Sequence, residues 1–146
     1  MAPEILARIR NAEWLVQRLG HWPAFHDAEV LRVVLERDSS GGPAASFLIH
    51  AWNMLSEVDQ RGYYVLDKHT LIEFRAAGLL ECNLVDFNHQ NAILELDVIT
   101  ELVRDQPVFR LIISTSYGLS ADILAASLEV ISVRPCDASG KLEGGL

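Results

Sequence analysis

The sequence holds only two cysteines, and their scarcity excludes two classes of protein. Cys82 and Cys136 are not part of any CxxC spacing, so the sequence predicts neither a structural zinc site nor a disulfide-framed secreted fold. Cys82 lies in an apolar run and is expected to be buried as a small hydrophobe. Cys136 begins the C-terminal tail and is expected to be exposed.

Long apolar runs are also missing. A bilayer-spanning helix needs about 18 or more consecutive apolar residues. The longest run here, Val108 to Ile113, is short and is interrupted by Arg110. The N-terminus lacks the basic start and apolar centre of a signal peptide. We therefore expect a cytoplasmic protein with no membrane partner.

Positive charge is scarce. The 146 residues include 12 Lys and Arg against 20 Asp and Glu, a formal net charge of −8. Between Glu81 and Glu101 there is no Lys or Arg at all, while five carboxylates occur there: Glu81, Asp86, Glu95, Asp97 and Glu101. The negative electrostatic field of these carboxylates repels nucleic acid and attracts a basic protein partner. The other interpretation, that surplus acid only keeps the domain soluble, stays open.

Familiar catalytic and cofactor motifs are absent. The sequence contains no GxSxG, no P-loop, no GxGxxG and no HExxH, and no serine or cysteine lies in a recognisable nucleophile context. We therefore predict no catalytic residue, no metal site and no cofactor from motifs.

Half of the residues are hydrophobic, and their spacing predicts one helix followed by a sheet. Pro3 to Leu19 has an apolar stripe at helical spacing and stops at Gly20, with Asn11 as a candidate break point. Alternating patterns predict strands, and Ser56 to Lys68 is expected to be a loop. The expected strands are 28–37, 45–55, 69–76, 79–85, 92–99 and 108–115, with a seventh in the second half of 120–134.

These elements predict an α+β fold: an N-terminal helix followed by a mostly antiparallel β-sheet of about six or seven strands. Residues 1–136 are expected to form a single domain, and residues 137–146 a flexible C-terminal tail. Residues 120–128 fit a helix or a strand, because an alanine-rich stretch precedes β-branched residues.

The densest cluster of chemically useful side chains runs from His21 to Val30. His26, Asp27 and Glu29 are residue types that bind metals or exchange protons. The structural interpretation, favoured by their position in a turn, is that they satisfy backbone groups. Trp22 and Phe25 are more typical of a core contact than of an interface.

A second polar cluster, Asp86 to Asn91, contains the ordinary residues of a turn between strands. It could form part of a catalytic or metal-binding site only if the fold brings Asn88 and His89 close to His26 and Asp27. The sequence cannot show such convergence.

The string Gly20-His21-Trp22-Pro23-Ala24-Phe25-His26-Asp27-Ala28-Glu29-Val30 and the later string Phe87-Asn88-His89-Gln90-Asn91 resemble the two signatures of a bacterial family, immunity protein 50. The resemblance covers roughly residues 20–134. It implies that the following are signature positions: Trp22, Phe25, His26, Asp27, Glu29, Asn88, His89 and Asn91.

The resemblance implies a non-enzymatic protein that neutralises a cognate toxin domain of a polymorphic toxin system by direct binding. The five carboxylates between Glu81 and Glu101 are then the expected partner-binding residues, and the toxin domain is expected to be basic. One alternative is a small enzyme or metal-binding domain that uses His26, Asp27, Glu29 and the Asn88–His89 pair. Another is a homodimer formed through an exposed sheet edge or face.

Overall fold

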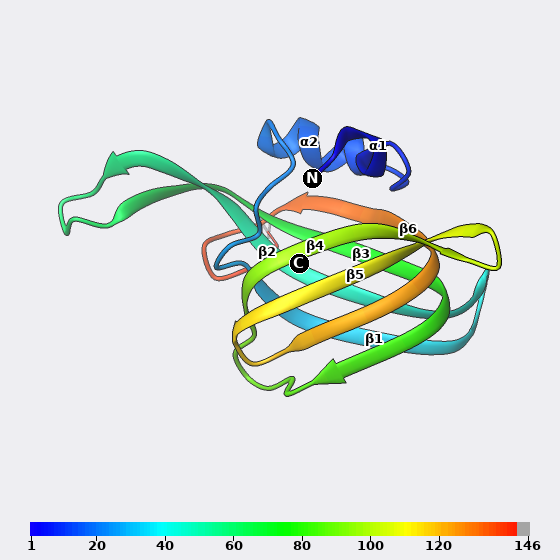
Figure 1. Ribbon diagram of the computed structural model, residues 1–146. Coiled ribbons are helices and arrows are strands. Elements are labelled where there is room, and N and C mark those ends of the chain that lie inside the picture. The colour runs from blue at the N-terminus through cyan, green and yellow to red at the C-terminus, as the bar shows by residue number, and fades with distance from the viewer. Residues whose placement is uncertain (143–146) are drawn as a thin grey trace.

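The computed structural model describes residues 1–142, so residues 143–146 of the expected tail lie outside the described residues. Six antiparallel strands form one sheet that closes into a barrel in the order β1-β2-β3-β6-β5-β4 (Figure 1). The strands are β1 (Glu29–Ser39), β2 (Gly42–Val58), β3 (Tyr64–Val85), β4 (Ala92–Val103), β5 (Gln106–Tyr117) and β6 (Ser120–Pro135).

The expected α+β class with a long N-terminal helix is wrong, because the protein is mostly β. The helical part consists of α1 (Pro3–Leu6), with 4 residues, and α2 (Ala12–Leu19), with 8. Both lie along one side of the barrel, at the top of Figure 1. Tertiary contacts divide the predicted helix: the Arg10 N–H donates to the Leu128 carbonyl, and the Val130 N–H donates to the Arg10 carbonyl. Asn11 then adopts a φ of 63°, which a continuous helix does not allow.

The third and fourth expected strands are one strand, so the sheet has six strands. β3 passes through Gly78, which has a φ of +68°. A Cβ at this position would come within 2.8 Å of the Ala126 side chain on β6. Glycine therefore allows the strand to bend and continue rather than end. Residues 120–128, which the sequence left open, belong to β6.

The expected loop 56–68 is instead a projecting hairpin. β2 and β3 extend beyond the rest of the sheet and leave the barrel together, at the left of Figure 1. We call residues 53–67 the arm. Asp59 forms its turn by accepting hydrogen bonds from the N–H groups of Arg61 (2.8 Å) and Tyr63 (3.1 Å). Val58, Tyr64, Val65 and Leu66 of this segment therefore lie on strands, with Tyr63 in the turn between them, but all are outside the barrel.

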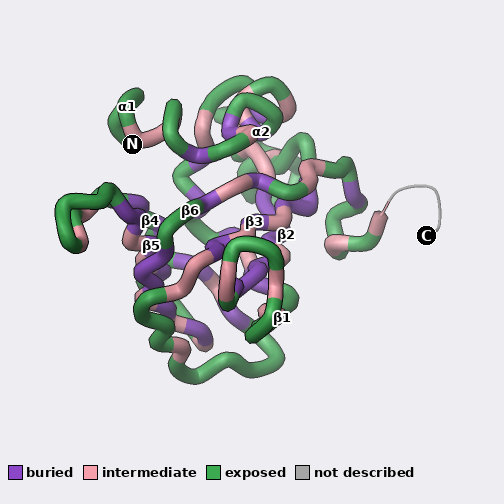
Figure 2. The backbone as a smooth tube through the Cα atoms, turned by 90° about the vertical axis from the view of Figure 1, so that its right-hand side faces the viewer, coloured by how far each residue is buried: buried purple, intermediate pink, exposed green. Residues whose placement is uncertain are grey.

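The barrel interior and the inner side of α2 share one hydrophobic core. Phe47, Ile72, Ile123 and Val130 are fully buried between the strands, and Leu15 of α2 joins the same cluster. The buried positions, purple in Figure 2, lie mostly on the strands, and β2 has an unbroken buried run from Ala44 to Phe47. Among residues 1–142, the helices are too short and too polar to cross a membrane.

The described part of the expected tail is folded back on the sheet. Cys136 and Leu142 form an antiparallel bridge, and Asp137 accepts hydrogen bonds from Ser139 and from the Lys141 N–H. These bonds, the Ser139 hydroxyl first, lower the pKa of Asp137. The flexibility expected for residues 137–146 stays a prediction.

Candidate functional site

The aromatic residues of the first signature string anchor a loop to the barrel. Trp22, Phe25 and Phe74 form a cluster of three edge-to-face contacts, with ring centroids 5.8 to 6.0 Å apart. Phe25 is buried, and Phe74 comes from the inner face of β3. Such contacts stabilise the packing beyond the area they bury. Trp22 and Phe25 therefore fix the position of the loop that carries His26 and Asp27.

The loop backbone then joins β4. The Asp27 N–H donates to the Ile93 carbonyl (2.9 Å), and His26 contacts the Leu94 carbonyl through Nδ1 (3.1 Å). The His26 Nε2 lies 3.7 Å from Asp27 Oδ1, and both side chains are more than half exposed. Phe25 and Asp27 both have positive φ, so this segment is a tight turn rather than an extended strand.

Asn91 is the buried centre of the second signature string. Its Oδ1 accepts hydrogen bonds from the N–H groups of Asn88 and Leu119, both at 3.0 Å. Its Nδ2 donates to the carbonyls of Val30 (3.2 Å) and Asn88 (2.8 Å). One amide thereby joins the β3–β4 turn, β1 and the β5–β6 turn. All four contacts are with backbone groups, as expected for a structural residue.

Gly118 lets the β5–β6 turn reach that amide. Its φ is +83°, and an added Cβ would lie 2.2 Å from the Gln90 carbonyl and 2.6 Å from Asn91 Oδ1. No other residue fits this close approach.

The remaining signature residues lie apart from one another. Asn88 closes its own turn, since its Nδ2 donates to the Asp86 carbonyl and its Oδ1 accepts from the Gln90 N–H. His89 is exposed and packs edge-on against Tyr117. Glu29 begins β1, where it pairs with His50 of β2 and Ala92 of β4.

These positions do not form a catalytic constellation. Within residues 1–142, no hydrogen bond or ion pair joins the side chains of His26 or Asp27 to those of Asn88 or His89. The same part of the chain contains no group of three or more His, Cys, Asp or Glu able to hold a metal ion. The convergence that the enzyme or metal-binding alternative requires is therefore not observed.

Two grooves flank the loop instead. The first has a volume of about 480 Å³ and lies between the loop and the base of the arm, with Phe25, His26, Trp52 and Met54 in its wall. The second, about 400 Å³, lies between the loop and β4. Its wall includes Trp22, His26, Glu95 and Asp97. We call it the β4 groove.

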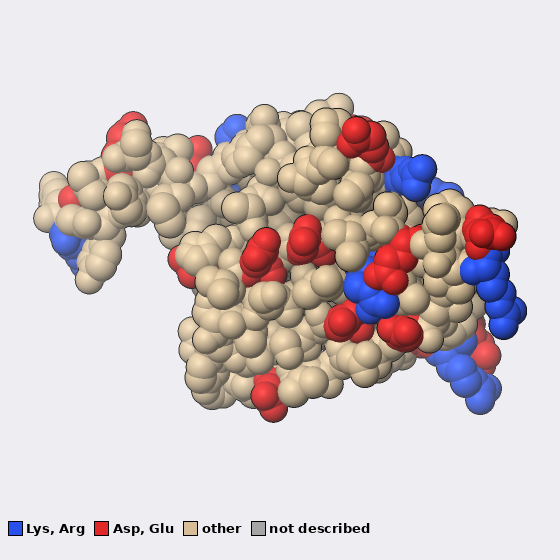
Figure 3. All heavy atoms as spheres, viewed as in Figure 1, with Lys and Arg blue, Asp and Glu red and all other residues tan. Residues whose placement is uncertain are grey.

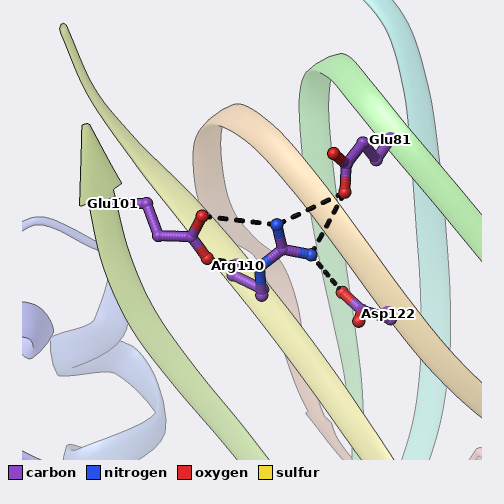
Figure 4. Close-up of polar contacts among 4 residues, drawn as sticks. All are labelled: Glu81, Glu101, Arg110 and Asp122. Carbon is purple, nitrogen blue, oxygen red and sulfur yellow. Dashed lines mark hydrogen bonds and ion pairs between the residues drawn. The ribbon is translucent and has the colours of Figure 1, made fainter. Parts of the chain in front are cut away.

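Two of the five predicted partner-binding acids bind an arginine of the chain itself. Arg110 on β5 has a side chain only 18% exposed, and it lies among three carboxylates (Figure 4). It donates to Glu101 of β4, to Asp122 of β6 (2.5 Å) and to Glu81 of β3 (3.3 Å). The Arg110 bond is the main reason that the pKa of Glu101 is lowered, and the two shortest bonds raise the pKa of Arg110.

Arg110 and Asp122 are members of this group that the sequence did not indicate. Three carboxylates around one guanidinium leave a net charge of −2. The cluster therefore stays acidic even though it contains an arginine, and its members come from four neighbouring strands. Only strand order, which is a tertiary property, could have revealed it.

Within residues 1–142, the other three predicted acids have no cation beside them. Glu95 and Asp97 are exposed on β4, and Asp86 is exposed in the β3–β4 turn. No hydrogen bond or ion pair is formed by the carboxylates of these residues within 1–142. Figure 3 shows acidic side chains spread across the face that β4 and β5 turn to the viewer. We call Glu81, Glu95, Asp97, Glu101, Asp122 and Arg110 the acidic face.

The sequence also did not indicate a histidine pair at the base of the arm. His50 Nε2 and His69 Nδ1 are 3.0 Å apart at the base of the arm, and the Trp52 ring packs against both imidazoles. Burial lowers the pKa of His50, nearby His69 lowers it further, and Asp137 opposes the shift. Arg18 donates to Thr70 and to the His69 carbonyl, so α2 is fixed at the same place. The pair holds the base of the arm, and the two histidines are too far apart in sequence to suggest it.

Comparison of the chain with protein-family models, with curated proteins and with solved structures found no match.

Proposed function

We propose that this protein is a non-enzymatic binding protein of the immunity type, which neutralises a cognate toxin domain by direct contact. The toxin domain docks with a basic surface on the acidic face. The resemblance of the two signature strings to immunity protein 50 names the class.

The observation that carries the proposal is the exposure of Glu95 and Asp97 and their lack of an ion-pair partner within residues 1–142. Both are exposed, neither has a cation beside it among the described residues, and both line the β4 groove beside Trp22. A lysine or arginine from a partner would meet two carboxylates and an aromatic ring there. Glu101 would bind a partner's cation less strongly than Glu95 or Asp97, because its carboxylate already forms a hydrogen-bonded ion pair with Arg110.

The signature residues support a scaffold role in this proposal. Asn91 and Asn88 bond to backbone groups, and Trp22 and Phe25 pack onto Phe74. They hold the loop and the start of β4 in fixed positions, so the β4 groove is preformed. A preformed surface binds without the cost of ordering loops.

The test measures association of the purified protein with the product of the neighbouring gene, by stopped-flow fluorescence at low and high salt. Glu95→Lys and Asp97→Lys are expected to slow association about tenfold at low salt, and the effect should shrink as ionic strength rises. Glu36→Lys is the matched control, because Glu36 is an exposed acid on β1, outside the acidic face.

Equal association rates for the Glu95, Asp97 and Glu36 variants would rule out the acidic face as the docking surface. Absence of any binding to the neighbouring gene product would count against the immunity function itself.

A further inference from the structure

The end of the described chain is attached to the sheet at the His50–His69 pair. We call residues 136–142 the C-terminal turn. The Cys136 N–H donates to the His69 carbonyl (3.0 Å). Gly140 lies beside the other nitrogen of His50, since an added Cβ at Gly140 would be 3.2 Å from His50 Nδ1. The His50 ring therefore cannot move away from His69 without displacing the C-terminal turn.

The bond between the two imidazoles depends on how many protons they carry. It joins His50 Nε2 to His69 Nδ1 at 3.0 Å, so one nitrogen donates a hydrogen and the other accepts it. One extra proton on the pair leaves this bond possible, because one ring is still neutral. A second extra proton puts hydrogens on both nitrogens, so no acceptor remains and two positive charges lie side by side. The contact therefore requires that at least one ring is neutral.

The surroundings of the pair do not compensate a second charge. His50 is only 6% exposed, and the Trp52 ring packs against both imidazoles. A groove of about 480 Å³ lies beside His69. The charged and titratable groups around the pair are Glu29 opposite His50 on β1, Arg134 in the same row on β6, the Arg32–Glu73 ion pair in the next row of that face, His21 in the wall that contains Trp52, Arg18, Asp67, Lys68 and Asp137 in the groove beside His69, and Lys141 next to Asp137. The Lys and Arg residues in this set outnumber the carboxylates.

Acid is the condition that weakens the pair. Burial and the neighbouring His69 lower the pKa of His50 below its ordinary value of about 6.5, and Asp137 opposes part of the shift. Folding therefore favours the neutral form of His50. This contribution to the free energy of unfolding is present above about pH 6.5 and is lost as the pH falls through the lowered pKa.

We infer that the His50–His69 pair is a proton-sensitive switch: when both rings are protonated they separate, and the C-terminal turn leaves the sheet while the barrel stays folded. The barrel does not depend on this contact. Successive strand residues point to opposite faces, so the core side chains Ile49 and Ile72, both fully buried, lie on the other face of β2 and β3 from His50. Opening uncovers the His50 ring and the Cys136 thiol, and the base of the arm then presents a different surface in acidic solution.

The test follows the Cys136 thiol, which is only 3% exposed while the turn is in place. In the full chain with Cys82→Ser, Cys136 is the one remaining thiol, and its rate of reaction with dithiodipyridine is measured from about pH 7.5 to about pH 4.5. The reference is the Cys136→Ser chain, whose remaining thiol, Cys82, is exposed. The ratio of the two rates removes the pH dependence of the reagent itself. We expect this ratio to rise at least about tenfold as the pH falls through the lowered pKa of His50.

Variants of the pair assign the effect to the two imidazoles. His69→Gln keeps a hydrogen-bonding group opposite His50 but leaves only one ring to protonate, so the ratio should stay constant with pH. His50→Gln is the second variant and should give the same result. His89→Gln is the matched control, because His89 is an exposed histidine in the β3–β4 turn, and its ratio should rise as in the parent chain.

Near-ultraviolet circular dichroism at each pH reports whether the barrel stays folded. A ratio that does not change with pH in the parent chain would overturn the inference. So would an equal rise in His69→Gln and His50→Gln, which would assign the opening to carboxylates such as Asp137. A rise that occurs only together with loss of the near-ultraviolet signal would also overturn it, because the whole barrel would then be unfolding.

Discussion

At the scale of single residues, the asparagine side chains of the second signature string form hydrogen bonds with backbone groups, although the sequence offered them as candidate site residues. Asn91 satisfies four backbone groups from three segments, and Asn88 closes a turn. Their amides are suited to this role, because an amide both donates and accepts. Glu95 and Asp97, by contrast, are exposed in the β4 groove and form no ion pair within residues 1–142.

Replacing Asn91 with leucine is expected to lower the free energy of unfolding by about 3 kcal/mol, because buried backbone groups of Val30, Asn88 and Leu119 lose their partner. Urea denaturation measures the change. Asn88→Ala is the control and should cost about 1 kcal/mol or less, since Asn88 is exposed. A loss below about 1 kcal/mol for Asn91→Leu would show that the amide is dispensable.

The predicted burial of the two cysteines was wrong in both cases. Cys82 was expected to be buried, but it is exposed, because β2 stops pairing with β3 at Ala77 and leaves the end of β3 uncovered on that side. Cys136 was expected to be exposed, but it is buried beside the turn that returns through Leu142. Both outcomes depend on where neighbouring strands end, which hydropathy does not encode.

At the scale of elements, the weakest junction of the barrel is the one between β1 and β4. The two strands share a single register pair, Glu29 with Ala92, and a few backbone hydrogen bonds around it. By contrast, β3 and β6 pair from Thr70 to Val85. Two features stabilise this short junction. One is the loop that carries Trp22 and Phe25, and the other is the side-chain amide of Asn91. Barrel closure thus depends on the two signature strings.

Hydrogen exchange should reveal that difference. The amides of Val30 and Ile93 at the β1–β4 junction are expected to exchange at least about a hundredfold faster than that of Ile72 at the centre of β3, because a short junction opens locally. Exchange is followed by NMR at constant pH. Equal protection at both places would mean that the barrel opens only as a whole.

At the scale of the whole molecule, charge is arranged across strands that are distant in sequence. Arg110 joins β3, β4, β5 and β6 through one guanidinium and three carboxylates (Figure 4). The lowered pKa of Glu101 means that its ionised form is favoured by folding. The ionised Glu101 therefore contributes to the free energy of unfolding above the ordinary glutamate pKa of about 4.3, and this contribution is lost as the pH falls through the lowered pKa.

Arg110→Met is therefore expected to lower the melting temperature by several degrees at pH 7, because three carboxylates then repel one another without a cation. The difference from wild type should shrink as the pH falls from 7 through the lowered pKa of Glu101, because protonation of Glu101 removes its ion pair with Arg110. Differential scanning calorimetry across this range measures it. Arg37→Met is the control, since the only ion pair of Arg37 within the described residues is with its exposed neighbour Asp38. A difference that stays constant with pH would assign the effect of Arg110 to packing alone.

The sequence by itself determined the strand-rich character of the chain, most strand positions and the acidic surplus, because alternation and composition are local properties. Only the tertiary structure decided that Pro3 to Leu19 divides at its contact with β6, that β3 continues through Gly78, and that the sheet closes into a barrel. The Arg110 cluster, the His50–His69 pair and the exposed face of the arm likewise arise from pairing between distant strands. Register and strand order fix such contacts, and no local pattern carries them.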